Sequence, residues 1–143
     1  MGLFSFLKDA GKSIFGGSAE AAEPEKLKEE IAGAGVDASK FDVAIEGDKV
    51  VLSGAAATQE EREKAILAVG NIEGVATVED VVTVAAPEPE SAFYEVKKGD
   101  TLSGIAKSQY GDGNKYMKIF EANKPMLSHP DKIYPGQKLR IPA

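Results

Sequence analysis

The alternation of apolar and polar residues divides this chain into two folded segments. Between residues 24 and 84, apolar residues first recur at helical spacing, then at every second position, and then at helical spacing again. A valine-rich run follows. This pattern predicts helix, two-stranded hairpin, helix and strand. From residue 93 onward it predicts strand, helix, helix and strand. The segment 86–92, APEPESA, contains two prolines and two glutamates and is typical of a linker. We therefore expect two small domains of the α+β class, each with helices packed on a small sheet.

A further helix is predicted before the first domain. Leu3, Leu7, Ala10 and Ile14 recur at helical spacing. We assign residues 1–17 to an amphipathic helix that docks on the domain after it. A membrane-bound helix is the alternative, and it predicts vesicle binding that is lost when Phe4 and Phe6 become polar. Positive charge for that role comes only from two lysines, so we do not expect a membrane partner.

The hairpin is specified by its turn as well as by its apolar pattern. Gly47 and Asp48 form a two-residue connection. Such a turn places three pairs opposite one another: Glu46 with Lys49, Ile45 with Val50, and Val43 with Leu52. Charge and hydrophobicity agree with this register.

The second helix of the first domain has a defined start and end. Thr58 and Glu61 have the spacing of a capping box, and Gly70 stands where a helix C-cap is expected. In the strand that follows, Val78, Val82 and Val84 share one face, and Asp80 falls on the same face. We expect a bulge or a sheet-edge position to accommodate that carboxylate.

Two stretches carry a family resemblance. The first segment, with GNIEGVATV at residues 70–78, resembles a BON domain, which implies an αββαβ order over residues 24–85. The second, with YEVKKGDTLSGIAKSQYG and later IYPGQKLRIP, resembles a LysM domain, which implies a βααβ order over residues 93–143. In this arrangement, with MGLFSFLKDAG in front, the whole chain resembles the bacterial cytoplasmic potassium-binding proteins of BON–LysM architecture.

Composition removes several classes of function. The net charge of −6 disfavours binding to nucleic acid, and the lack of cysteine excludes thiolate chemistry. The single histidine, His129, lies in a turn-like SHPD and is expected to be exposed. Glu79 and Asp80 are consecutive on a strand and point to opposite faces, so they cannot flank one substrate. We expect no enzyme and, because no targeting segment is visible, a cytoplasmic monomer.

The favoured function is selective potassium binding, in a sensor or buffer of this ion. Backbone carbonyls suit a large monovalent cation, and they need glycine-permitted turns and helix ends rather than a side-chain motif. Two glycines lie within residues 70–74. The resemblance implies that potassium is held by main-chain oxygens of two stretches, from Leu7, Ala10, Lys12, Gly70, Ile72 and Val75. The ammonium of Lys12 must point away from the ion. Binding is expected to compact the protein.

The alternative is a glycan-binding protein that uses the LysM segment. The resemblance implies a groove for peptidoglycan formed by Gly99, Asp100, Thr101, Leu102, Asn123, Ile133 and Tyr134. Peptidoglycan is the less favoured partner, since a chain without a signal sequence does not meet the cell wall. The other interpretation is that the LysM segment packs on the BON segment and steadies it.

Overall fold

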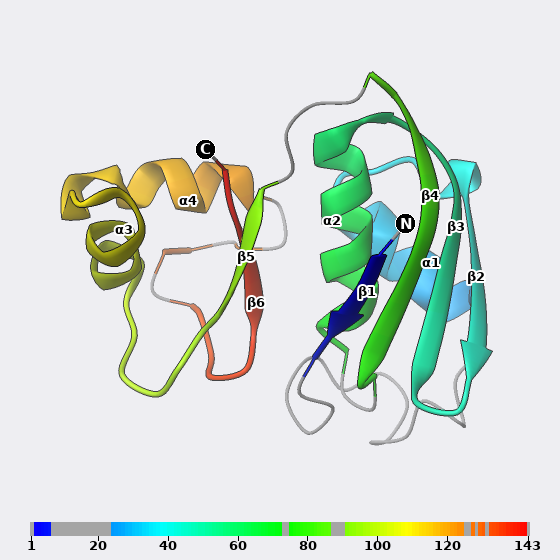
Figure 1. Cartoon of the computed structure of the whole chain (residues 1–143), viewed down its shortest axis with the longest axis horizontal. Coiled ribbons are helices and arrows are strands. Elements are labelled where there is room, and N and C mark those ends of the chain that lie inside the picture. Colours follow the sequence, from blue (N-terminus) through cyan, green and yellow to red (C-terminus); the bar gives the residue numbers. More distant parts are fainter. Residues whose placement is uncertain are drawn as a thin grey trace.

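The computed structural model describes residues 2–6, 24–72, 75–86, 91–124, 127, 129–130 and 132–142. The described chain forms two sheets, one of four strands in the order β1-β4-β3-β2 and one of two strands, β5-β6. Each sheet has its own cluster of buried apolar residues. We call residues 2–6 and 24–86 the N-terminal domain and residues 92–142 the C-terminal domain (Figure 1).

The N-terminal domain has two helices on one face of its sheet (Figure 1). Its elements are β1 (Gly2–Ser5), α1 (Pro24–Gly33), η2 (Ala38–Lys40), β2 (Phe41–Glu46), β3 (Lys49–Thr58), α2 (Gln59–Gly70) and β4 (Thr77–Ala86). β3 and β4 are parallel, and α2 is the crossover that such a pair requires. The predicted order of helix, hairpin, helix and strand is confirmed.

The hairpin register is the predicted one. Glu46 lies opposite Lys49, Ile45 opposite Val50 and Val43 opposite Leu52. The start of α2 is also as predicted, because the hydroxyl oxygen of Thr58 accepts a hydrogen bond from the Glu61 main-chain N–H at 3.2 Å. Local turn and capping chemistry was therefore sufficient to place these boundaries.

The first residues form a strand, so the prediction of a helix is wrong for them. β1 pairs antiparallel with β4, with Leu3 opposite Glu79 and Phe4 opposite Val78. Exposure alternates along it, since Leu3 is 66% exposed and Phe6 only 6%. The unpaired backbone of β4 offers hydrogen bonds that a helix would not satisfy, and the two phenylalanines turn inward. The rest of the expected helix lies outside the described residues.

Asp80 corrects a second expectation. β4 has no bulge at this position and is an inner strand, covered at its edge by β1. The carboxylate is fully buried and is bound by the guanidinium of Arg62 from α2, with Nε 2.7 Å from Oδ2. Its other oxygen accepts the Val82 main-chain N–H at 2.9 Å. A buried carboxylate is thus accommodated by a partner from the helix rather than by a break in the strand.

The C-terminal domain has the expected strand, helix, helix and strand order. Its elements are β5 (Ala92–Glu95), α3 (Leu102–Tyr110), η3 (Gly113–Lys115), α4 (Tyr116–Ala122) and β6 (Lys138–Ile141). Residues 134–137, with proline second and glycine third, have the residue types of a type II turn and form one before β6. Gln137 donates its N–H to the Tyr134 carbonyl at 3.1 Å, and Gly136 has φ of 91°.

The two domains meet where α2 faces β6 (Figure 1). The Arg140 Nε lies 2.7 Å from Oε1 of Glu63, and both side chains are buried. The rings of Phe4 and Phe93 lie 5.2 Å apart between centroids. Buried polar and aromatic contacts therefore join the two domains.

Candidate functional site

The last residue of α2 and the loop that follows it contain half of the predicted ion ligands. α2 continues through Gly70, and the Asn71 N–H donates to the Leu67 carbonyl at 2.9 Å. Ile72 and Val75 have fully buried side chains, and the Ile72 carbonyl accepts the Val75 N–H at 3.1 Å. Because these side chains are apolar and lie in the core, these residues can offer a ligand only their main chain. Residues 73–74 are outside the described part.

Gly70 is required for a reason other than a left-handed helix cap. It is still helical, and its φ is not among the positive values. A Cβ at this position would lie 2.0 Å from Cζ of Phe6, so only glycine leaves room for that ring. The expectation that Gly70 is the helix C-cap is wrong by one residue, because Asn71 is the cap and the contact with Phe6 explains the glycine.

Phe6 brings the N-terminal segment to this loop. Its main-chain N–H donates to the Ala76 carbonyl at 2.8 Å, and its ring covers Gly70. Sequence reasoning missed this role, although alternation of the two phenylalanines along β1 was a signal for it. The remaining predicted ligands, Leu7, Ala10 and Lys12, follow directly in the chain and lie outside the described residues.

The C-terminal domain reaches the same loop. Oδ1 of Asn71 accepts the Lys138 main-chain N–H at 2.9 Å, and Nδ2 donates to the Lys138 carbonyl at 2.9 Å. The ammonium of Lys138 lies 5.1 Å from the ring centroid of Phe6. Burial lowers the pKa of this ammonium, and nearby Glu95 opposes that shift. Two segments that are far from this loop in the sequence, one with Phe6 and one with Lys138, therefore converge on Gly70 and Asn71.

Charge is divided unevenly between the domains. Residues 24–86 contain six Lys or Arg and thirteen Asp or Glu, for a net charge of −7. Residues 92–142 contain nine Lys or Arg and five Asp or Glu, for a net charge of +4. The domain that carries the candidate loop is thus the acidic one, and its field favours cations.

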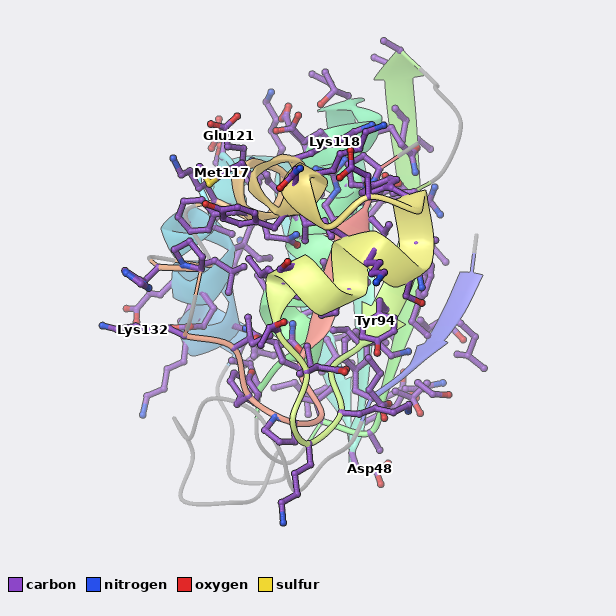
Figure 2. The ribbon with its side chains drawn as sticks, turned by 90° about the vertical axis from the view of Figure 1, so that its left-hand side faces the viewer. Asp48, Tyr94, Met117, Lys118, Glu121 and Lys132 are labelled. Atoms are coloured by element: carbon purple, nitrogen blue, oxygen red, sulfur yellow. The ribbon has the colours of Figure 1, made fainter. Side chains whose placement is uncertain are left out.

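Part of the predicted glycan groove lies beside a cavity at the start of α3. Oγ1 of Thr101 caps α3 by accepting the Gly104 N–H at 3.0 Å. Beside it, Asp100 accepts a hydrogen bond from the Tyr94 hydroxyl at 2.6 Å, which with the Lys97 main-chain N–H lowers the pKa of Asp100. Figure 2 shows Tyr94 just below α3. The cavity, of about 400 Å³, is lined by Thr101, Leu102, Ser103, Tyr116, His129 and Pro130.

The other predicted glycan residues are only partly available. Gly99 has φ of 89° in the turn before Asp100. Asn123 is 2% exposed and hydrogen-bonded to the main chain of Ile119 and Arg140. Ile133 packs against the apolar core, and burial raises the pKa of Tyr134 to about 12. His129 is exposed, as predicted, and lines the cavity. Glycan binding stays a prediction. The side chain of Asn123 is not available for it, because that side chain is buried and hydrogen-bonded within the protein.

None of the helices that the structure describes is both long and apolar enough to cross a membrane. Among the described side chains there is no group of three or more His, Cys, Asp or Glu that could hold a metal ion.

Comparison with known proteins gives matches to two family models. The model of the BON domain matches residues 24–86, and the model of the LysM domain matches residues 94–142. These matches correspond to the two domains described above.

Relatives match the whole chain or a part of it. The chain is 50% identical over 147 residues to the potassium binding protein Kbp of Escherichia coli O6:H1, and the match covers 99% of each chain. An uncharacterized protein of Deinococcus radiodurans is 39% identical over 72% of this chain and 44% of its own length. The uncharacterized protein YqbP of Bacillus subtilis is 45% identical over 34% of this chain and 26% of its own length.

Proposed function

Because this chain belongs to the family of potassium-binding proteins that join a BON to a LysM domain, we propose that it binds potassium. The observation that carries the proposal is identity of 50% over 99% of both chains with a relative named for that ion. We further propose that the chain acts as a sensor or buffer of potassium and performs no catalysis.

The proposed site is a ring of main-chain oxygens from two stretches of chain. Gly70, Ile72 and Val75 supply one stretch, and the other consists of Leu7, Ala10 and Lys12. The contact of Phe6 with Gly70 and Ala76 supports this arrangement, because it holds Phe6 against the loop. The second stretch begins at the next residue in the chain, Leu7.

Neutral carbonyls fit the chemistry of this ion. Potassium is large and loses its hydration shell readily, and several carbonyl dipoles replace that shell without strong ion pairing. The net charge of −7 on residues 24–86 adds a weak, salt-screened attraction for any cation. Selectivity would then come from the number and spacing of the oxygens.

Binding should make the protein more compact. Without the ion, carbonyls directed at one point repel one another, whereas the bound ion joins the N-terminal segment to the loop. An ion that binds the compact state better stabilises that state by mass action, so stability should depend on potassium concentration.

The test is a titration of the exhaustively desalted protein with potassium chloride, followed by amide NMR and calorimetry, with sodium chloride as the control. We expect saturable shifts centred on residues 7–12 and 70–75 with potassium and much weaker ones with sodium. Equal responses to both salts, or shifts confined to other residues, would contradict the proposed site. A chain without residues 1–12 should lose the potassium response.

A further inference from the structure

The outer edge of β6 is occupied by two asparagine side chains. Asn123, from the end of α4, accepts the Arg140 N–H at 2.7 Å and donates to the Arg140 carbonyl at 3.0 Å. Asn71 makes the same pair of bonds with Lys138, at 2.9 Å each. One asparagine belongs to the C-terminal domain, and the other comes from the loop after α2 in the N-terminal domain.

The geometry of a strand explains why both asparagines can bind there. Alternate residues direct their main-chain N–H and C=O groups to opposite edges. Gln137 faces β5, since its carbonyl accepts the Val96 N–H at 2.8 Å. Lys138 and Arg140 therefore face the other edge, where polar groups need partners once they are buried. Each asparagine supplies one acceptor and one donor, as a neighbouring strand would.

The position of Asn71 connects this edge to the proposed ion site. It stands between Gly70 and Ile72, two of the proposed ligands, and it is 8% exposed. The residue that it binds, Lys138, also places its ammonium over the ring of Phe6, and that ring covers Gly70. A displacement of β6 would therefore change two contacts that lead to the loop. One is the pair of hydrogen bonds with Asn71, and the other is the contact of the Lys138 ammonium with the Phe6 ring.

We propose that Asn71 is a positioning residue through which the C-terminal domain holds the ion-binding loop in its binding geometry. That Asn71 joins the two domains follows from its hydrogen bonds alone. That Asn71 affects ion binding rests on the proposed function. Linkage then requires reciprocity: β6 docked on Asn71 raises potassium affinity, and bound potassium strengthens the docking by the same factor.

Hydrogen exchange tests the joining without potassium. In Asn71→Ala, the Lys138 amide should exchange faster, while the Arg140 amide keeps its bond to Asn123 and its protection. The matched variant Asn123→Ala should show the reverse. If the Lys138 amide is as protected in Asn71→Ala as in the wild-type chain, Asn71 does not hold β6 and the inference fails.

Potassium titration of the same full-length variants tests the positioning. Loss of two hydrogen bonds of ordinary strength predicts that the dissociation constant for potassium rises about tenfold in Asn71→Ala. A second pair of variants changes Lys138, the hydrogen-bond partner of Asn71. Lys138→Pro removes the N–H that Asn71 accepts, whereas Lys138→Ala loses the ammonium but keeps the N–H. We expect Lys138→Pro to bind potassium more weakly than Lys138→Ala.

The outcomes separate the two proposals. Unchanged potassium affinity in Asn71→Ala, together with lost protection at Lys138, would make the contact a docking contact only and overturn the positioning role. A wild-type chain that gives no potassium response would overturn the proposed function, and with it the positioning role. The exchange pattern would still decide whether Asn71 joins the domains.

Discussion

At the scale of single residues, several positions are determined by a distant partner. Gly70 is an example, because the ring of Phe6 occupies the space that any side chain would need. Asp80 is another, because the guanidinium of Arg62 neutralises its buried charge. In both cases the residue type is unexpected for its place in a helix or strand and is explained by the residue that contacts it.

The pair formed by Arg62 and Asp80 gives a prediction about stability. Arg62→Met would leave a fully buried carboxylate without its cation, and we expect a loss of about 3–5 kcal/mol in the free energy of unfolding. In the double variant with Asp80→Val the uncompensated charge is absent, so most of that loss should be recovered. Urea unfolding of the three chains measures both effects. A double variant as unstable as Arg62→Met would contradict this explanation.

At the scale of elements, β1 contributes through its inward side chains. It covers the edge of β4, and its extended form directs Phe4 and Phe6 toward the core while Leu3 faces solvent. The membrane alternative for this segment required the phenylalanines on an exposed face. The structure places Phe4 against the core of the N-terminal domain and Phe6 within it.

Phe6 and Leu3 form a matched pair for testing this element. We expect Phe6→Ala to lower the free energy of unfolding by about 3 kcal/mol, since a buried aromatic ring is lost. It should also weaken potassium binding, because the N-terminal segment is no longer held on Gly70. Leu3→Ala, at a side chain 66% exposed, should change either quantity little. Thermal unfolding and potassium titration of both variants check this, and equal effects would contradict it.

At the scale of the whole molecule, an acidic domain is joined to a basic one. Glu63 is the buried centre of that contact. Its carboxylate binds the Arg140 guanidinium, the Ser91 main-chain N–H and the Gln59 amide, at 2.7 to 2.9 Å. The contact therefore combines an ion pair with hydrogen bonds to the segment that leads into β5.

The protonation of Glu63 should make the domain contact sensitive to acid. Burial raises the pKa of its carboxyl, but the hydrogen bonds from Ser91, Gln59 and Arg140 outweigh burial and leave the pKa below its ordinary value. The stabilisation is thus complete above the unfolded-state pKa of about 4.3 and is lost as the pH falls through the lower folded-state value. The thermal midpoint measured between pH 6 and pH 3 should fall accordingly.

A matched substitution isolates this effect. Glu63→Gln should lose stability at neutral pH and show a shallower fall in acid, because the titrating group is gone. Glu60→Gln is the control: the Glu60 side chain pairs with Lys64 at 2.8 Å but is itself 56% exposed, so we expect this pair to contribute little. Identical pH profiles for wild type and Glu63→Gln would rule out Glu63 as the source.

The sequence alone determined what depends on neighbouring residues. The two-residue turn set the hairpin register, Thr58 started α2, and the residues of the type II turn placed the start of β6. Domain order and the loop after α2 also followed from local pattern and family resemblance. These features require only residues a few positions apart, so their chemistry is visible in the linear chain.

Only the tertiary structure decided the features that depend on distant partners. The first residues became a strand because the edge of β4 was available, and Asp80 could be buried because Arg62 reaches it from α2. Asn71 lies in the loop directly after α2, yet its side chain binds a strand residue 67 positions away. No local pattern encodes such pairings, since hydrogen bonds and close packing form between whichever groups the fold brings together.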